Sequence, residues 1–160
     1  MSENILIPLD GSKLGEGAIS YVSKMIAKLA PEERVSITLF HVITAVRHSI
    51  HLQGGAGSLA IPYNEEELSS IRRESEKYLD EIGQGFQQNK QVSVAIKISV
   101  NENPAAAIIK AEEEVSADLV AMSTHGRSGF FRFAIGSVAD KVMRGGSVPV
   151  LMVKARELGV

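Results

Sequence analysis

Two short segments combine small, polar and charged residues in patterns that suit the binding of a phosphorylated ligand. The first is Pro8-Leu9-Asp10-Gly11-Ser12, and the second runs from Ser123 to Gly129 and is followed by Gly136-Ser137. Glycines let the backbone approach a ligand closely or adopt a positive φ angle. At Gly136-Ser137, free backbone N–H groups and a hydroxyl would meet at the positive end of a helix, which favours phosphate. A plain turn and a helix cap would explain the same residues, because glycine-rich loops before helices are common.

Familiar phosphate-handling motifs are absent. The chain has no G-x-x-x-x-G-K-[ST] stretch, which excludes a Walker-type nucleoside triphosphatase. Gly11, Gly15 and Gly17 are not spaced as G-x-G-x-x-G, which disfavours a nicotinamide or flavin site. A phospho-acceptor receiver domain would need a second acidic residue beside Asp10 and an aspartate at the end of a middle strand. The third strand ends in Val100-Asn101, which disfavours this class of protein. The sequence also lacks paired carboxylates in a motif and a nucleophile with a matching base, so no catalytic residues are predicted.

Three histidines, His41, His48 and His51, raise the question of a metal site. Only His48 and His51 are close in sequence, and the chain has no cysteine. A metal site needs three or four ligands arranged in advance, so these residues do not predict one. The lack of cysteine also excludes disulfides and a thiolate nucleophile.

Composition points to one globular domain over residues 1–160. The chain has 44% apolar and 22% charged residues and a formal net charge of −2. Without a basic excess, there is no electrostatic argument for nucleic acid or an anionic membrane as partner. The apolar runs are shorter than the roughly 18–20 residues of a membrane span. Met1-Ser2-Glu3-Asn4 has no basic region of a signal peptide, and we therefore expect a cytoplasmic protein.

The segments that must position these residues alternate between strand and helix patterns. Apolar or alternating runs predict strands at 4–9, 35–42, 92–100, 118–122 and 148–153. Apolar residues at steps of three and four predict helices over 12–29, 68–86, 104–115 and 137–144. This alternation indicates an α/β fold, in which a parallel sheet carries helices on both faces. Both segments then lie beyond the carboxyl ends of strands, where open parallel sheets bind ligands.

Several boundaries have specific signals. Ser12 is expected to cap the first helix and Pro31 to stop it, and Asn103-Pro104 is expected to begin the third. Residues 44–64 are expected to form a long irregular loop, because His, Gly and Pro break every period there. The expected buried face of the third helix consists of Ala105, Ile108, Ile109 and Val115.

Read as one pattern, the second segment resembles a family signature. Ser123-Thr124-His125-Gly126, nine residues and then Gly136-Ser137 look like the universal stress protein signature G-x2-G-x9-G-[ST], with Ser123 at the first glycine. The resemblance covers essentially the whole chain and includes residues 5–12, 103–104, 117–120, 138–142 and 148–153. It implies a single-domain, five-stranded parallel sheet of order 3-2-1-4-5, similar to the adenine nucleotide alpha hydrolase fold.

In nucleotide-binding members of that family, ATP lies across the ends of strands one, two and four. The resemblance implies that ATP, or AMP or ADP, would bind here, with any Mg²⁺ held through the phosphates. Asp10 would accept hydrogen bonds from the ribose hydroxyls; its alternative role is a turn in which it bonds its own backbone. For the adenosine, the resemblance implies contacts with Pro8 and Leu9, with Val42 against adenine and with Met122 and Ser123 beside the base and the ribose. For the phosphates, it implies the backbones of His125, Gly126 and Gly129, with Arg127 at the terminal phosphate. Gly136, Ser137 and Val138 would close the site at the helix start.

Three functions remain open on the sequence. The first is a regulatory stress-response protein that binds an adenine nucleotide. The second is a slow ATPase or a self-phosphorylating protein, with Ser123, Thr124 or Ser137 as acceptor. The third is a dimeric scaffold that binds no nucleotide. The resemblance implies a homodimer, and the short apolar strand Pro149–Val153 at a sheet edge gives a physical reason for one.

Overall fold

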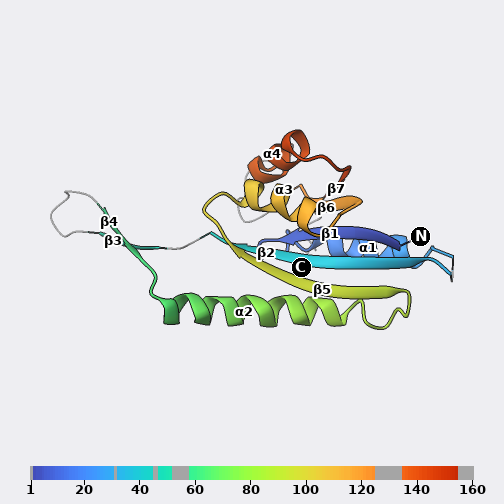
Figure 1. Cartoon of the computed structure of the whole chain (residues 1–160), viewed down its shortest axis with the longest axis horizontal. Coiled ribbons are helices and arrows are strands. Elements are labelled where there is room, and N and C mark those ends of the chain that lie inside the picture. Colours follow the sequence, from blue (N-terminus) through green and yellow to red (C-terminus); the bar gives the residue numbers. More distant parts are fainter. Residues whose placement is uncertain (1, 31, 45–46, 52–57, 125–134, 155–160) are drawn as a thin grey trace, which may run out of the picture.

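The computed structural model describes residues 2–30, 32–44, 47–51, 58–124 and 135–154 of the chain. A five-stranded sheet of order β5-β2-β1-β6-β7 lies at its centre, and all neighbouring strands in it are parallel (Figure 1). Numbered along the chain, this order reads 3-2-1-4-5, which confirms the predicted fold class. The strands are β1 (Ser2–Leu9), β2 (Arg34–Ile43), β5 (Val92–Val100), β6 (Leu119–Ser123) and β7 (Val150–Val153).

Helices cover both faces of this sheet, as predicted. The helices are α1 (Gly17–Ile26), α2 (Glu65–Gln84), α3 (Pro104–Glu114) and α4 (Ser137–Gly145). Successive side chains of a strand point to opposite faces. Ile5 and Ile7 of β1 therefore join one buried cluster with α1 and α2, whereas Leu6 joins a second cluster with α3 and α4 (Figure 1).

The segment predicted as an irregular loop contains a β-hairpin, so that prediction was wrong. β3 (Arg47–His51) and β4 (Ser58–Pro62) pair antiparallel, with Arg47 opposite Pro62 and Ile50 opposite Leu59. The hairpin extends away from the main sheet, at the end of the molecule where α2 begins (Figure 1). The strands are only five residues each and mix polar with apolar residues, which is why composition concealed them.

The start of the first helix also differs from the prediction. α1 begins at Gly17, and its cap residue Glu16 makes no side-chain capping bond. Ser12 instead holds a tight turn before the helix, where its Oγ accepts a hydrogen bond from the Gly15 N–H at 2.9 Å. The helix ends at Ile26, several residues before the predicted stop at Pro31, which lies outside the described residues.

Two other helix starts confirm their signals. The Asn103 side chain accepts a hydrogen bond from the Ala106 N–H at 3.1 Å, and Pro104 is the first residue of α3. α4 begins at Ser137, as predicted. Both helices therefore start at the edge of the sheet where β1, β2 and β6 end.

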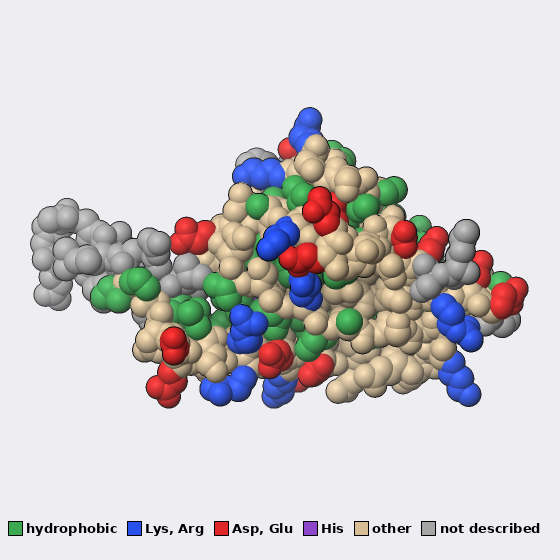
Figure 2. Space-filling view, viewed as in Figure 1, with side chains coloured by type: hydrophobic (Ala, Val, Ile, Leu, Met, Phe, Trp, Pro, Cys, Tyr) green, Lys and Arg blue, Asp and Glu red, His purple; other side chains and the backbone are tan. Residues whose placement is uncertain are grey.

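Charges on the visible face of the molecule are mixed. Lys, Arg, Asp and Glu side chains are interspersed on the described part of that face, in keeping with the small formal charge of −2 (Figure 2). No helix in the described ranges is both long and apolar enough to cross a membrane.

Candidate functional site

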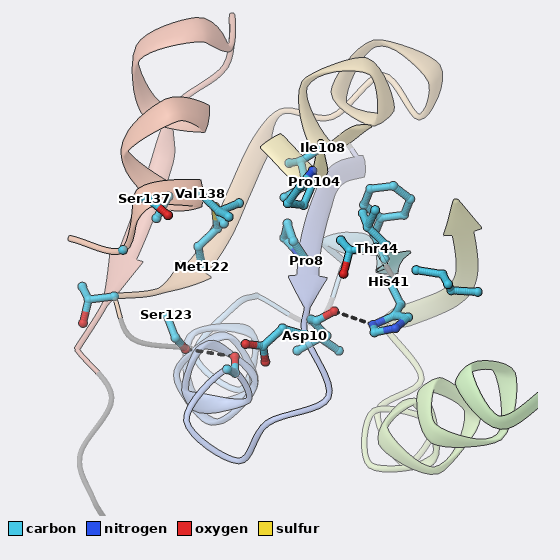
Figure 3. A pocket seen from close by; sticks show the side chains of 18 of the residues that line it. Pro8, Asp10, His41, Thr44, Pro104, Ile108, Met122, Ser123, Ser137 and Val138 are labelled. Carbon is cyan, nitrogen blue, oxygen red and sulfur yellow. Dashed lines mark hydrogen bonds between the residues drawn. The ribbon is translucent and has the colours of Figure 1, made fainter. Parts of the chain in front are cut away.

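A cavity of about 420 Å³ opens at the carboxyl ends of the strands, between β1 and β6, where the strand order reverses. This volume lies in the range of small-molecule sites. Of the residues predicted from the sequence, those lining it are Pro8, Leu9, Asp10, Val42, Met122, Ser123, Gly136, Ser137 and Val138 (Figure 3). The other predicted residues, His125, Gly126, Arg127 and Gly129, lie outside the described residues. That any of these residues binds a ligand stays a prediction.

The sequence analysis missed part of the lining, most of it apolar. Ile108 belongs to the predicted buried face of the third helix, and Phe40 lies within a predicted strand, yet both line the cavity. A place for Pro104 and Ile108 near the cavity could have been predicted from the sequence. A helix that begins at Asn103-Pro104 directly after a parallel strand must start at the carboxyl ends of the strands, where the cavity lies. The additional lining residues are Gly15, Phe40, His41, Ile43, Thr44, Ile71, Pro104, Ile108, Thr124 and Ala139.

Asp10 lines the cavity and shapes the turn after β1 at the same time. Its Oδ1 accepts hydrogen bonds from the Ser12 N–H at 2.9 Å and from the Ser12 hydroxyl at 2.6 Å. These bonds form the turn that the sequence analysis gave as the alternative role of the Asp10 side chain. They also fix the carboxylate at the cavity wall, so the two roles are compatible.

Ser123, at the first glycine of the signature, uses its side chain to hold α1. Its hydroxyl donates to the Gly15 carbonyl at 3.0 Å and accepts from the Ala18 N–H at 3.0 Å (Figure 3). Within the described ranges, Ser116 is the one non-glycine residue with a positive φ, of 48°, so Ser123 carries no strain of that kind. The Ser123 hydrogen is committed to a carbonyl, which disfavours this hydroxyl as a phosphate acceptor.

His41 joins the ends of β1 and β2 at the cavity wall. Its Nδ1 lies 2.8 Å from the Leu9 carbonyl oxygen (Figure 3). A carbonyl can only accept, so we assign the proton to Nδ1.

Behind His41, a polar contact links α2 to the start of α1. The Tyr78 ring meets the His41 ring edge-on at 6.4 Å, and the Tyr78 hydroxyl donates to Glu16 at 3.3 Å. Burial, and then the Glu16 carboxylate, raise the pKa of Tyr78 far above its usual range. Tyr78 is therefore a neutral hydrogen-bond donor, and Lys13 pairs with Glu16 at 3.0 Å on the solvent side.

The start of α4 supplies the groups that attract anions. The first N–H groups of a helix have no partner within the helix, and the helix dipole is positive there. Ser137, Val138 and Ala139 occupy this first turn and line the cavity. The Gly136 N–H donates to the Thr124 carbonyl at 3.0 Å, which ties the helix start to the end of β6.

Asp10 and His41 are the only His, Cys, Asp or Glu side chains among the described residues that line the cavity. Among the described residues, no group of three His, Cys, Asp or Glu side chains could hold an ion. His48 lies in the hairpin, whereas His41 lies in β2 at the cavity wall.

The fold and the cavity together define a class of protein. The protein is a doubly wound α/β domain with a cavity at the switch point of its sheet, where apolar walls meet a carboxylate and a helix start. The universal stress protein family model matches residues 1–154. The chain therefore belongs to the universal stress protein family.

Known proteins of the family resemble the chain over nearly its whole length. The universal stress protein MJ0577 of Methanocaldococcus jannaschii is 28% identical over 161 residues, covering 98% of this chain and 97% of the relative. A solved structure of MJ0577 matches with a TM-score of 0.72 and 22% identity, covering 97% of both chains.

Two further solved structures of the family contain a nucleotide. An Archaeoglobus fulgidus universal stress protein in complex with dAMP has a TM-score of 0.60 and 16% identity, covering 96% of this chain and 98% of that one. A universal stress protein in complex with cAMP has a TM-score of 0.53 and 19% identity, with the same coverage of 96% and 98%. Identities this low show the fold alone.

Proposed function

We propose that this protein binds an adenine nucleotide, ATP first and AMP or ADP as alternatives, and acts as a cytoplasmic regulatory protein of the stress response. The observation that carries the proposal is one cavity in which an apolar wall, the Asp10 carboxylate and the start of α4 meet. These three features suit the base, the sugar and the phosphates of a nucleotide respectively. The dAMP and cAMP complexes of relatives support the choice of an adenine nucleotide.

The adenine ring would occupy the apolar part of the cavity. Val42 and Met122 come from strands on either side of β1, and Ile108 comes from α3. Side chains of this kind pack against the face of a flat ring and exclude water from it. The ribose would then lie at the Asp10 carboxylate, which can only accept hydrogen bonds when ionised and so suits hydroxyl donors.

The phosphates would lie at the start of α4. Backbone N–H groups and the Ser137 hydroxyl are the described donors in this part of the lining. Arg127, with the backbones of His125, Gly126 and Gly129, is the proposed partner of the outer phosphates. Mg²⁺, if bound, would be held through the phosphate oxygens.

Nucleotide released from gently purified protein tests the proposal. We expect ATP, ADP or AMP near one per chain after denaturation and chromatography. Asp10→Asn keeps an acceptor for the Ser12 turn but removes the negative charge, so we expect about tenfold weaker binding of ATP by calorimetry. Gly136→Val adds a branched side chain whose Cβ would lie 3.4 Å from the Thr124 carbonyl, which narrows the helix start and should abolish binding.

Asp80→Asn is the matched control for Asp10→Asn, because Asp80 is exposed on the outer face of α2. It should bind ATP like the wild type. No released nucleotide, together with no binding of added ATP, would leave a scaffold that acts through protein contacts. Hydrolysis or phosphate transfer well above background would favour the enzymatic alternative, with Thr124 or Ser137 as the acceptor.

We also propose that two copies of the chain pair through β7. This strand lies at the end of the sheet, and its four residues are only partly buried. The Pro149 carbonyl accepts from the Val120 N–H of β6, and the Val153 carbonyl accepts from the N–H of Thr124, which follows β6. By alternation, the Met152 N–H points away from β6. An apolar edge strand with outward N–H groups is normally covered, and a second β7 would cover it.

A backbone substitution separates this edge pairing from side-chain packing. Met152→Pro removes the outward N–H and should shift the protein from dimer to monomer in analytical ultracentrifugation. Met152→Ala removes the same side chain but keeps the N–H, so it should stay dimeric. A monomeric wild type, or a dimeric Met152→Pro variant, would argue against pairing at β7.

A further inference from the structure

Three hydrogen bonds, with the Gly15 backbone between the first and the second, connect Ser123, at the end of β6, to Asp10, which follows β1. The Ser123 hydroxyl donates to the Gly15 carbonyl at 3.0 Å. The Gly15 N–H donates to the Ser12 Oγ at 2.9 Å, and the Ser12 hydroxyl donates to the Asp10 Oδ1 at 2.6 Å. We call these four residues the relay. Asp10, Gly15 and Ser123 line the cavity, and Figure 3 shows Asp10 and Ser123 with the hydrogen bond that Ser123 donates.

Each side chain in this relay takes part in at least two hydrogen bonds. Ser123 also accepts from the Ala18 N–H at 3.0 Å, which anchors it to α1. Asp10 Oδ1 also accepts from the Ser12 N–H at 2.9 Å. The bond from Ser123 fixes the position of the Gly15 backbone, and the Gly15 N–H in turn orients the Ser12 hydroxyl that donates to Asp10. Ser123 and Asp10 are therefore linked through the position of this turn.

Packing leaves this relay little freedom. Gly15 is buried, and a Cβ built there would collide with the Asp10 Oδ1 and lie 3.1 Å from the Ser12 Oγ. A glycine at position 123, as in the family signature, has no hydroxyl and could not make either of the bonds of Ser123. The relay is therefore a property of this sequence at that position.

We propose that Ser123 is a positioning residue, which through Gly15 and Ser12 fixes the Asp10 carboxylate and so sets the preference for ribose over deoxyribose nucleotides. This inference rests on the proposed function and deepens it. Ser123 acts through another residue, because its own donor is spent on the Gly15 carbonyl. Loss of the hydroxyl leaves the carboxylate in place but loosely oriented, so ribose hydroxyls are recognised less well.

The preference is measured as a ratio of dissociation constants. Wild-type protein is titrated by calorimetry with ATP, 2′-dATP and 3′-dATP. We expect about a tenfold preference for ATP over at least one deoxy analogue, as for a hydrogen bond to a charged acceptor. Ser123→Ala should lower that ratio to about threefold or less, and Ser123→Thr, which keeps a hydroxyl, should restore it.

A merely structural role would give a different pattern. It would lower the melting temperature and weaken all three ligands together, with the ratio unchanged. If Ser123→Ala does not fold, Ser12→Ala interrupts the same relay at another link and should also lower the ratio. A wild type without preference, or variants that keep it, would overturn the inference although ATP binds. A wild type that binds none of the three nucleotides would overturn the proposed function itself.

Discussion

Replacing the buried Glu112 of α3 by glutamine should stabilise the protein, and increasingly so as the pH rises. Glu112 is 2% exposed, and its Oε2 accepts a long hydrogen bond of 3.2 Å from the Ser147 N–H. Its Oε1 is buried and has no hydrogen-bond partner among the described residues. Burial raises the pKa of Glu112, because the charged form is poorly solvated there.

The groups around Glu112 explain why its carboxyl group favours the protonated form. A Cβ built on Gly146 would lie 2.6 and 2.7 Å from the Glu112 oxygens and 2.9 Å from the Val142 carbonyl oxygen. Three acceptor oxygens thus converge on one point near the end of α4, where the helix dipole is negative. A protonated carboxyl or an amide offers a donor at this point, whereas a carboxylate adds a further negative charge.

The sign of the pH dependence follows from the raised pKa. The folded protein binds this proton more tightly than the unfolded chain does. The contribution of Glu112 to stability is therefore fully present below the unfolded pKa of about 4.3 and is lost as the pH rises through the higher folded pKa. A glutamine keeps the shape and does not titrate, so its advantage over Glu112 grows with pH.

A buried polar group without a partner costs roughly 1–3 kcal/mol. For a chain of this size, each kcal/mol shifts the melting temperature by about 2–4 °C. We expect the free energy of unfolding of Glu112→Gln to be about 1–3 kcal/mol higher than that of the wild type at pH 9, in thermal and urea unfolding. At pH 5 the difference should be much smaller. Glu113→Gln is the matched control, because Glu113 is exposed on the same helix and should change stability by less than about 0.5 kcal/mol. A Glu112→Gln variant less stable than wild type at pH 9, or a difference independent of pH, would refute the reasoning.

Three further substitutions follow from the packing. Gly146→Ala should lower the free energy of unfolding by about 1–3 kcal/mol, because the new methyl group meets the Glu112 oxygens. In a Glu112→Ala background, urea unfolding should show a smaller decrease in that free energy. Asn64→Ala should cost about 1 kcal/mol in the same assay, since Asn64 forms a capping box with Glu67 at 2.8 and 2.9 Å; an unchanged midpoint would contradict this. Gly15→Ala should displace the Asp10 carboxylate and weaken ATP binding at least tenfold in calorimetry, and retained affinity would show that the turn yields without loss.

The fold was predictable because its signals are local. Alternation over Val92–Val100 gave both ends of β5 correctly. The pair Asn103-Pro104 located the start of α3, since a capping side chain and a proline at the first helical position act on their own backbone. The hairpin of β3 and β4 was not predicted because its strands pair with each other across a glycine-rich stretch, and neither strand has a clear pattern of its own.

The core of α3 shows what sequence periodicity misses. Ala105 and Ile108 are buried as expected, but the stripe also includes Glu112, which no apolar pattern predicts. Its burial depends on Gly146, which is close in space but comes from the end of α4. Ser123 is a similar case, because its partners Gly15 and Ala18 are more than 100 residues away.

The cavity was located correctly by topology, although its walls were predicted only in part. The turn after β1 and the start of α4 were predictable because each combines glycine with polar or charged residues at the carboxyl end of a strand. His41 and Phe40 escaped because a residue inside a strand shows its direction only once the sheet is assembled. Asp10 forms its own turn and also lies at the cavity wall, so the turn does not exclude the predicted hydrogen bonds to ribose, which stay a prediction.

The measurement that tests the central claim most directly is a calorimetric titration of nucleotide-free protein with ATP. We predict saturable binding of one ATP per chain in the wild type and in Asp80→Asn, with about tenfold weaker binding in Asp10→Asn. The absence of any ATP binding in folded wild-type protein would contradict the assignment of the cavity as a nucleotide site. Equal binding in Asp10→Asn and Asp80→Asn would contradict the proposed contact between Asp10 and the nucleotide.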